Sequence, residues 1–218
     1  MATIVVPFAG AEGKTRLHRS SRLRAQLAEA MFLDVLTACV PVGETRVVTP
    51  DREAAKTALA VGAEALADPG GGQGAAVLAG LEGVEPGGIL VVNADLPCAV
   101  PHDLRSLLAA TPAGGIALVE ALDGTTNALS LPAPEAFAPL YGRASADRFR
   151  AHAAARGLEA VAVALPNLAD DVDTMDDLVR LQLRAGPHTQ ACLAELPGLF
   201  GRAAPASPAA LPADRSSV

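Results

Sequence analysis

The segment ILVVNADLP, residues 89–97, decides the fold class. Its first part, Ile89–Asn93, is the most apolar strand-like run of the chain, and strands buried on both faces of a sheet read as continuous apolar runs. We therefore predict that this strand is central in its sheet. The run leads directly into Asp95, so a carboxylate lies at the carboxyl end of the strand, where open α/β sheets collect their ligands.

Segments rich in β-branched residues alternate with Ala- and Leu-rich segments on both sides of this strand. Such alternation is typical of α/β folds with a largely parallel sheet. The other predicted strands are Thr3–Pro7, Arg46–Thr49, Gly115–Glu120, Ala128–Leu131 and Ala160–Leu165. The predicted helices are Ser21–Ala38, Arg52–Val61, Ala75–Leu81, Pro101–Ala110, Ala146–Arg156 and Met175–Arg184. The short connection 121–127 between two strands predicts a hairpin, which would make the sheet mixed.

Composition indicates one folded domain. Of the 218 residues, 50% are apolar and 19% are charged, so the chain can bury a sizeable core. We expect a single domain over residues 1–200. The segment GRAAPASPAALPADRSSV, residues 201–218, is rich in Ala, Pro and Ser and predicts a disordered tail.

Charge and residue usage narrow the function classes. The formal net charge is −7, from 17 basic and 24 acidic residues, which argues against sequence-independent binding to nucleic acid. With 5 Phe, 1 Tyr and no Trp, stacking platforms for bases are not expected. Three widely spaced cysteines predict neither a zinc site nor a disulfide framework. The N-terminus does not resemble a signal peptide, and no apolar run reaches the ~18 residues of a membrane span. We expect a cytoplasmic protein without a membrane segment.

A basic, glycine-containing loop, GAEGKTR at residues 10–16, follows the first predicted strand. Glycines let a backbone approach phosphate oxygens, and Lys14 and Arg16 supply charge for a polyphosphate. The P-loop pattern of nucleotide kinases is disfavoured, because Phe8 stands where that pattern needs glycine. A solvated basic loop without a ligand is the alternative interpretation.

Carboxylates at two places could hold a cation. Asp95 is a candidate ligand of Mg²⁺, although an aspartate after a strand is also a common cap of a turn or helix. Asp171 and Asp173 lie two residues apart, so on an extended segment both side chains point to one side. Paired carboxylates are costly unless a cation neutralises them, and Mg²⁺ binds through carboxylates and substrate phosphates. A solvated acidic turn is the alternative; it fits Asp176 and Asp177, which we expect in the first turn of a helix.

Together, the basic loop, the strand-end aspartate and the paired aspartates meet the needs of metal-dependent nucleotidyl transfer. This reaction moves a nucleoside monophosphate from a triphosphate to an acceptor oxygen and releases pyrophosphate. A magnesium ion would neutralise the α-phosphate, and the basic loop would receive the leaving pyrophosphate.

Five stretches carry a family resemblance: GKTRL (13–17), ADLP (94–97), GTTNALSLP (124–132), F-x-x-x-Y-G-x-x-S (137–145) and DVDTMDDL (171–178). In this order and spacing they resemble the 2-phospho-L-lactate/phosphoenolpyruvate guanylyltransferases of coenzyme F420 biosynthesis, from the first strand to about residue 184. The first two stretches are shared with many sugar-nucleotide and molybdopterin nucleotidyltransferases. The last three, taken together, are considerably more specific.

The resemblance implies a Rossmann-like, GT-A-like nucleotidyltransferase fold with a mixed, mostly parallel sheet flanked by helices. It implies GTP as donor, Mg²⁺ as cofactor, and phosphoenolpyruvate, 2-phospho-L-lactate or 3-phosphoglycerate as acceptor. Carried over by position, the catalytic residues are Lys14 and Arg16, and the metal ligands are Asp95, Asp171 and Asp173. The nucleotide-binding residues are Pro7, Gly13, Lys14, Arg16, Gly74 and Asn93, and the acceptor-binding residues are Asn127, Gly142 and Ser145.

Ser145 also has a direct interpretation. It stands at the start of a predicted helix, where its hydroxyl and nearby N–H groups could form an anion site. An ordinary N-cap is the alternative. The oligomeric state stays open, a homodimer included.

The chain departs from the family pattern at three places. Ala9 stands where Lys or Arg is frequent, Gly74 stands where the family has Asn, and Phe149 stands where a His is common, with His152 one helical turn later. These departures bear on base recognition and acceptor choice. Two other functions are therefore kept in view: another nucleotidyl- or glycosyltransferase of this fold, and a catalytically silent paralogue that only binds nucleotide.

Overall fold

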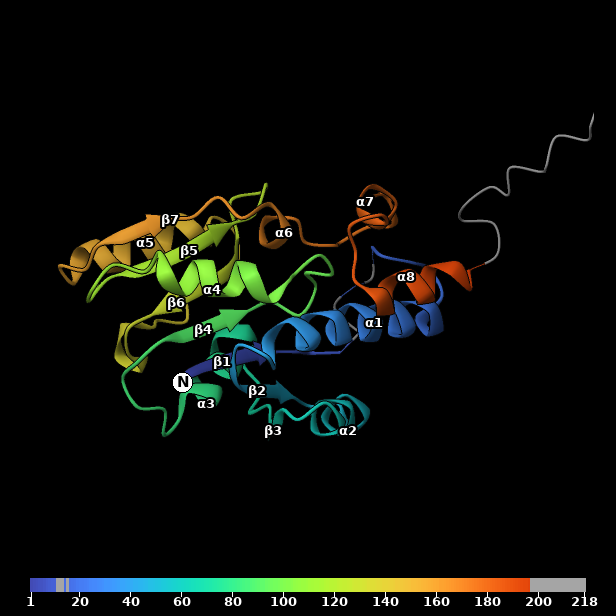
Figure 1. Cartoon of the computed structure of the whole chain (residues 1–218), viewed down its shortest axis with the longest axis horizontal. Helices are drawn as coiled ribbons and strands as arrows, with labels where there is room; N and C mark the ends of the chain where they lie inside the picture. The colour runs from blue at the N-terminus through green and yellow to red at the C-terminus, as the bar shows by residue number, and fades with distance from the viewer. Residues whose placement is uncertain (11–13, 15, 197–218) are drawn as a thin grey trace, which may run out of the picture.

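A computed structural model describes residues 1–10, 14 and 16–196 of the chain (Figure 1). Within this part, seven strands form one sheet in the order β3-β2-β1-β4-β6-β5-β7. The strands are β1 (Ala2–Pro7), β2 (Gly43–Thr49), β3 (Glu64–Ala67), β4 (Ile89–Val92), β5 (Ile116–Glu120), β6 (Thr126–Leu131) and β7 (Ala160–Ala162). The central place of β4 confirms the prediction from its unbroken apolar sequence.

The sheet is mixed because one strand, β6, runs against its neighbours. It pairs antiparallel with both β4 and β5, whereas β1, β2, β3 and β4 are parallel and β7 is parallel to β5. The predicted hairpin between β5 and β6 is confirmed. The last strand is shorter than predicted, since the ladder ends near Val163, whose N–H donates to Leu118, and Leu165 already caps the next helix.

The helices described by the structure cover both faces of this sheet. They are α1 (Ser21–Cys39), α2 (Arg52–Ala60), α3 (Gln73–Leu81), α4 (Pro101–Ala109), the 3-10 helix η1 (Pro134–Ala136), α5 (Ser145–Ala155), α6 (Pro166–Ala169), α7 (Met175–Leu181) and α8 (Pro187–Ala194). None of these combines the length and apolarity needed to cross a membrane.

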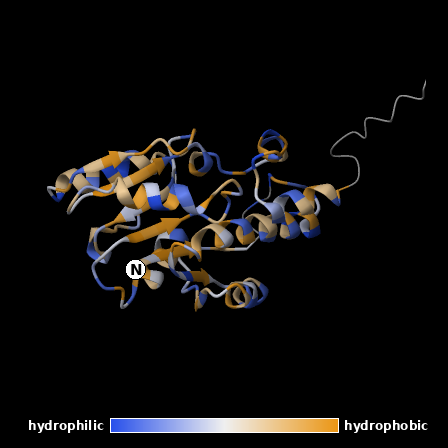
Figure 2. Cartoon of the chain, in the orientation of Figure 1, coloured by the Kyte–Doolittle hydropathy of each residue, from blue (hydrophilic) through white to orange (hydrophobic). Residues whose placement is uncertain are grey.

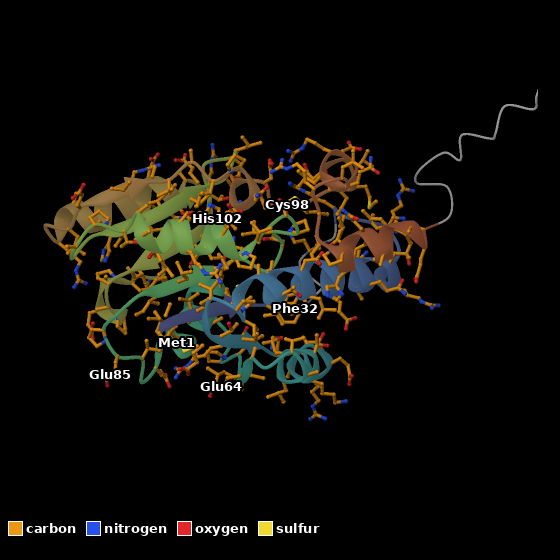
Figure 3. All side chains as sticks on the ribbon, viewed as in Figure 1. Met1, Phe32, Glu64, Glu85, Cys98 and His102 are labelled. Carbon is orange, nitrogen blue, oxygen red and sulfur yellow. The ribbon has the colours of Figure 1, made fainter. Side chains whose placement is uncertain are left out.

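Successive side chains of each strand point to opposite faces of the sheet, and an apolar core forms on each face. Ile4 and Val6 of β1 face one side, where they pack with α1, α2, α4 and α6. Val5 faces the other side, where it packs with α3 and α5. The strands are accordingly among the most hydrophobic ribbons of the molecule (Figure 2). Phe32 extends from α1 (Figure 3) and stacks on Phe8 just beyond β1, with ring centroids 4.4 Å apart.

A third apolar cluster joins α1 to α7 and α8, and α8 lies along α1 (Figure 1). Asp34 of α1, only 3% exposed, accepts hydrogen bonds from the first-turn N–H groups of His188 (3.0 Å) and Thr189 (2.9 Å). These N–H groups have no partner inside their own helix. A Cβ at Gly186 would stand 2.4 Å from the Asp34 carboxyl carbon, so the contact also requires glycine there.

Candidate active site

A cavity of about 280 Å³ opens at the edge where β1 and β4 end. Side chains from several distant segments line it, because parallel strands bring their carboxyl ends to one edge of the sheet. The lining residues are Pro7, Phe8, Ala9, Gly10, Lys14, Ala28, Met31, Asp68, Gly72, Gln73, Ala76, Asn93, Ala94, Asp95 and Asp173.

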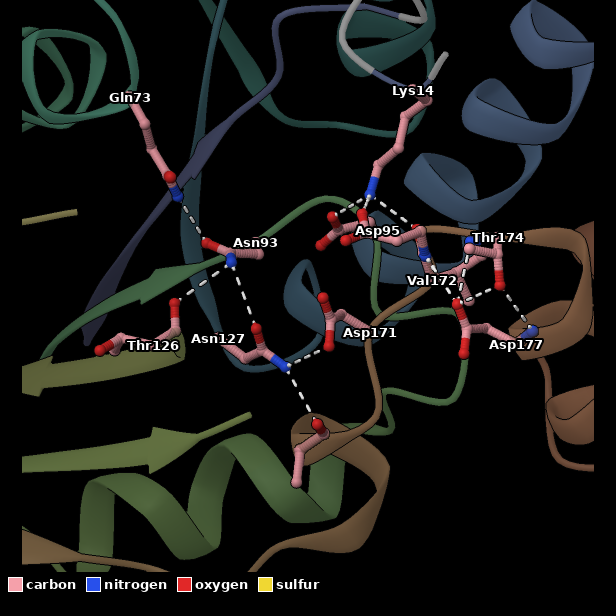
Figure 4. A network of polar contacts seen from close by, with 12 residues as sticks. Lys14, Gln73, Asn93, Asp95, Thr126, Asn127, Asp171, Val172, Thr174 and Asp177 are labelled. Atoms are coloured by element: carbon pink, nitrogen blue, oxygen red, sulfur yellow. Dashed lines mark hydrogen bonds and ion pairs between the residues drawn. The ribbon is translucent and has the colours of Figure 1, made fainter. Parts of the chain in front are cut away.

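Lys14 is the charged centre of this site. Its ammonium donates to Asp95 Oδ2 at 2.5 Å, to the Val172 carbonyl at 2.6 Å and to Asp173 Oδ1 at 2.8 Å (Figure 4). Burial alone would lower the pKa of Lys14, but the two carboxylates outweigh that effect and raise it. Lys14 is therefore a permanent cation that ties three distant segments together.

The three predicted metal ligands come together. Asp95, Asp171 and Asp173 each offer a carboxylate oxygen, and these oxygens lie within 4.8 Å of one another. Burial, followed by the charge of Asp95, raises the pKa of Asp171 to about 6. Oδ1 of Asp95 is buried and has no hydrogen-bond partner in the described part of the chain. An unpaired buried carboxylate oxygen beside two further carboxylates fits a divalent cation, which favours oxygen ligands.

Neighbouring aspartates hold this segment in place. Asp170 is bound on one oxygen by Arg180 (2.7 Å) and on the other by Arg184 (2.9 Å). Asp177 and Thr174 form a reciprocal capping box at the start of α7. Asp171 and Asp173 lie between these two anchors; Asp173 contacts Lys14, and Asp171 contacts Asn127.

Three side-chain amides, those of Gln73, Asn93 and Asn127, form a chain of hydrogen bonds that reaches Asp171. Gln73 Nε2 donates to Asn93 Oδ1 at 2.7 Å. Asn93 Nδ2 donates to the Thr126 carbonyl at 3.2 Å, with Asn127 Oδ1 at 3.5 Å. Asn127 Nδ2 in turn donates to the Ala169 carbonyl (3.2 Å) and, at 3.4 Å, to Asp171. Asn127 therefore holds the Asp171 carboxylate by a hydrogen bond (Figure 4).

Some of the predicted site residues line the cavity and others do not. Those that line the cavity are Pro7, Lys14, Asn93, Asp95 and Asp173. Asp171 and Asn127 adjoin them through the contacts above. Arg16 is exposed and does not line the cavity, and Gly142 is exposed on the turn before α5. Gly13 lies outside the described residues.

Gly74 and Ser145 have structural roles that the sequence interpretation did not include. Gly74 does not line the cavity; a Cβ there would stand 2.5 Å from the Pro139 Cβ, so packing against Pro139 accounts for glycine at this position. Ser145 is fully buried: its hydroxyl accepts from the Thr126 N–H at 2.9 Å and lies 3.2 Å from Thr126 Oγ1. The hydroxyl connects α5 to β6 and does not open to the cavity. Phe149 is likewise a core residue, 1% exposed.

The sequence interpretation missed two polar residues of the cavity: Asp68, directly after β3, and Gln73, the first residue of α3. No local signal marked Asp68, because the sequence EALA before it has no β-branched residue and does not predict a strand.

Comparisons with known proteins identify the family of this chain. A family model described as guanylyl transferase CofC like matches residues 2–196. The phosphoenolpyruvate guanylyltransferase of Streptomyces coelicolor is 37% identical over 209 residues, which are 89% of this chain and 96% of the relative. The phosphoenolpyruvate guanylyltransferase of Nocardia farcinica is 38% identical over 186 residues, 79% of this chain and 80% of the relative.

Solved structures share the fold. A nucleotidyl transferase from Methanothermobacter thermautotroptrophicus superposes with a TM-score of 0.63 and 17% identity, over 89% of this chain and 98% of the other. A protein from Desulfovibrio desulfuricans G20, assigned to the nucleotide-diphospho-sugar transferases, gives a TM-score of 0.71 at 17% identity, over 91% and 96% of the two chains. At this identity the likeness shows the nucleotidyltransferase fold alone.

Proposed function

The chain belongs to the CofC-like guanylyl transferases, and on that premise we propose that it transfers GMP from GTP to phosphoenolpyruvate with release of pyrophosphate. The name of the relatives supports phosphoenolpyruvate as acceptor, and the family resemblance supports a place in coenzyme F420 biosynthesis. GTP is a cytoplasmic metabolite, which supports a cytoplasmic enzyme. The observation that carries the proposal is the convergence of Lys14 with three carboxylates at the mouth of the cavity.

The residues present fit a magnesium ion. Asp95, Asp171 and Asp173 would hold it, since Asp95 Oδ1 is buried without a partner among the described residues and all three carboxylates are in reach of one another. When bound, the ion would neutralise charge on the α-phosphate and on the acceptor. Lys14 is placed to stay beside Asp95 and to bind the phosphates that the reaction releases.

The proposed reaction exchanges one phosphoanhydride for another. A phosphate oxygen of the acceptor attacks the α-phosphorus of GTP, the bond between the α-phosphorus and its bridging oxygen breaks, and pyrophosphate leaves with that oxygen. Both substrates are anions, so the chain must offset their repulsion. Lys14 supplies charge inside the cavity, and exposed Arg16 lies two residues further along the same segment. Asn127 orients Asp171.

A pyrophosphate-release assay tests the proposal. Wild-type protein is incubated with Mg²⁺, one of GTP, ATP, CTP or UTP, and one of phosphoenolpyruvate, 2-phospho-L-lactate or 3-phosphoglycerate. We expect release with GTP and phosphoenolpyruvate and none when either is omitted. Release with a different nucleotide, or with sugar phosphates only, would favour another nucleotidyl- or glycosyltransferase. No release with any pair would favour a silent paralogue.

Asp95→Asn and Asp176→Asn form a matched pair for the metal ligands. We expect Asp95→Asn to lose activity by a factor on the order of 10³, as when a central electrostatic group is removed. Asp176 is an exposed residue in the first turn of α7, so its variant should keep wild-type turnover. Equal turnover of both variants at saturating Mg²⁺ would contradict the assignment of Asp95.

A further inference from the structure

The cavity has a phosphate end and an opposite end that the proposed reaction has not used. Lys14, Asp95 and Asp173 form the first. The connection between β3 and α3 forms the second, with Asp68, Gly72 and Gln73 on the lining. In Figure 4, Gln73 and Lys14 lie on opposite sides of Asn93. A triphosphate at the first end therefore directs its nucleoside toward the second.

Stacking cannot select a base at this end. Phe8 is the one aromatic residue of the described chain that lines the cavity. It is only 9% exposed, and its ring already stacks on Phe32 at an interplanar angle of 6°. Apart from Lys14 and the aspartates, the other lining residues are small or aliphatic residues and amides, so we expect selection between bases to depend on hydrogen bonds.

Asp68 is the polar group best placed for this purpose. Asn93 is occupied by Gln73 and Thr126. Asp68 directly follows β3, and its Oδ1 accepts the Gly70 N–H at 2.7 Å. No salt bridge to Asp68 occurs among the residues that the structure describes. A carboxylate accepts about four hydrogen bonds, so one N–H from Gly70 leaves most of this capacity.

The backbone around Asp68 is built to hold it there. Gly70, Gly71 and Gly72 have φ values of +80°, +91° and +87°, which side chains other than hydrogen rarely allow. A Cβ at Gly70 or Gly72 would meet nothing within 4 Å. Backbone conformation, and not crowding, therefore calls for glycine at these two positions, and the resulting turn brings the Gly70 N–H onto Asp68.

We propose that Asp68 selects guanine, by accepting hydrogen bonds from its N1–H and N2–H groups. This inference rests on the proposed function and names the residue that chooses the donor nucleotide. Guanine presents these two donors side by side, whereas adenine presents an unprotonated N1 that a carboxylate repels. Adenine offers neither of these two donors, and one hydrogen bond to a charged group changes affinity about 10- to 100-fold, so kcat/KM for GTP should exceed that for ATP by at least this factor.

Asp68→Asn gives a gain-of-function test. The amide can keep the Gly70 contact with its oxygen and donate through Nδ2, which suits the C2 carbonyl of xanthine and not the C2 amine of guanine. We expect kcat/KM for GTP to fall about 10- to 100-fold, the usual effect of losing one hydrogen bond to a charged group. We expect activity with XTP to rise above activity with GTP.

Asp51→Asn is the matched control. Asp51 follows the neighbouring strand β2 and lies with Asp68 on a second hollow, but it does not line the cavity. It caps α2, and asparagine is an equally good N-cap. This variant should keep the wild-type preference for GTP over XTP. If Asp68→Asn also keeps that preference, the proposal is overturned.

A binding measurement on the wild-type protein tests the proposal even if the Asp68→Asn variant does not fold. ITP keeps N1–H and lacks the C2 amine, so it should bind about 10- to 100-fold more weakly than GTP by calorimetry. Equal binding of ITP and GTP would also overturn the role of Asp68. Absence of turnover with every nucleotide would instead contradict the proposed function, while these binding ratios would still test the base contact.

Discussion

At the scale of single residues, Lys14 organises the site because its ammonium has three acceptors on two segments that are far apart in the sequence. Asp95 comes from the end of β4, and Val172 and Asp173 come from the segment before α7. The contact keeps two carboxylates beside each other that would otherwise repel. Lys14 thus has a structural task as well as its proposed contact with phosphate.

Asp171 should make the stability of the metal-free protein depend on pH. Burial beside Asp95 raises its pKa from 3.8 to about 6, so the folded state binds this proton more tightly than the unfolded state. Protonation of Asp171 therefore adds to the free energy of unfolding below about pH 4, and this contribution is lost as the pH rises through 6. With chelator, we expect Asp171→Asn to melt about 2–4 °C above wild type near neutral pH, which is roughly 1 kcal/mol for a chain of this size.

The difference should close as pH falls to about 5, because wild-type Asp171 then becomes neutral as well. Asp176→Asn removes the same charge from the exposed surface of α7 and should follow the wild-type curve at every pH. Parallel melting curves for all three proteins would show that Asp171 does not carry this effect.

Ser145→Ala separates the observed role of this residue from the one that the family pattern predicts. The change leaves the buried Thr126 N–H without its acceptor, which costs about 1–3 kcal/mol. We expect the melting temperature to fall by about 2–4 °C for each kcal/mol, while KM for the acceptor stays within about twofold. An acceptor KM that rises tenfold at an unchanged melting temperature would restore the hydroxyl as a substrate ligand.

At the scale of elements, α8 depends on a side chain far away in sequence. Asp34 and His188 are 154 positions apart, yet the carboxylate of one caps the backbone of the helix that holds the other. Local sequence signals cannot reveal such a cap. The same holds for β3, whose sequence EALA has no β-branched residue and which is a strand only because its backbone pairs with β2.

Asp34→Ala tests this long-range cap. Two first-turn N–H groups of α8 would lose their buried acceptor, at about 1–3 kcal/mol for each. We expect the melting temperature to fall by at least about 4 °C and early proteolytic cleavage to move into residues 187–196. Asp147→Ala, an exposed residue of α5, is the control. Unchanged melting and cleavage in Asp34→Ala would contradict a stabilising role for the cap.

At the scale of the whole molecule, strong local patterns predicted the frame of the sheet and the convergence of its carboxylates at one edge. The apolar run of β4 predicted both the centre of the sheet and the place of Asp95 at its ligand-binding edge. The spacing of Asp171 and Asp173 predicted their shared direction. Burial of Ser145 and the close approach of Pro139 to Gly74 could not be predicted, because both depend on how α5 and the segment before it pack on the sheet.

The fate of each phosphorus atom of GTP tests the central claim most directly. Wild-type protein is given Mg²⁺, phosphoenolpyruvate and GTP radiolabelled at either the α- or the γ-phosphorus. Transfer of GMP predicts that the α-label enters a new product only when phosphoenolpyruvate is present, and that the γ-label is recovered entirely in pyrophosphate. Recovery of the γ-label in the acceptor or in inorganic phosphate would contradict the account, since it would show a kinase or a GTP hydrolase.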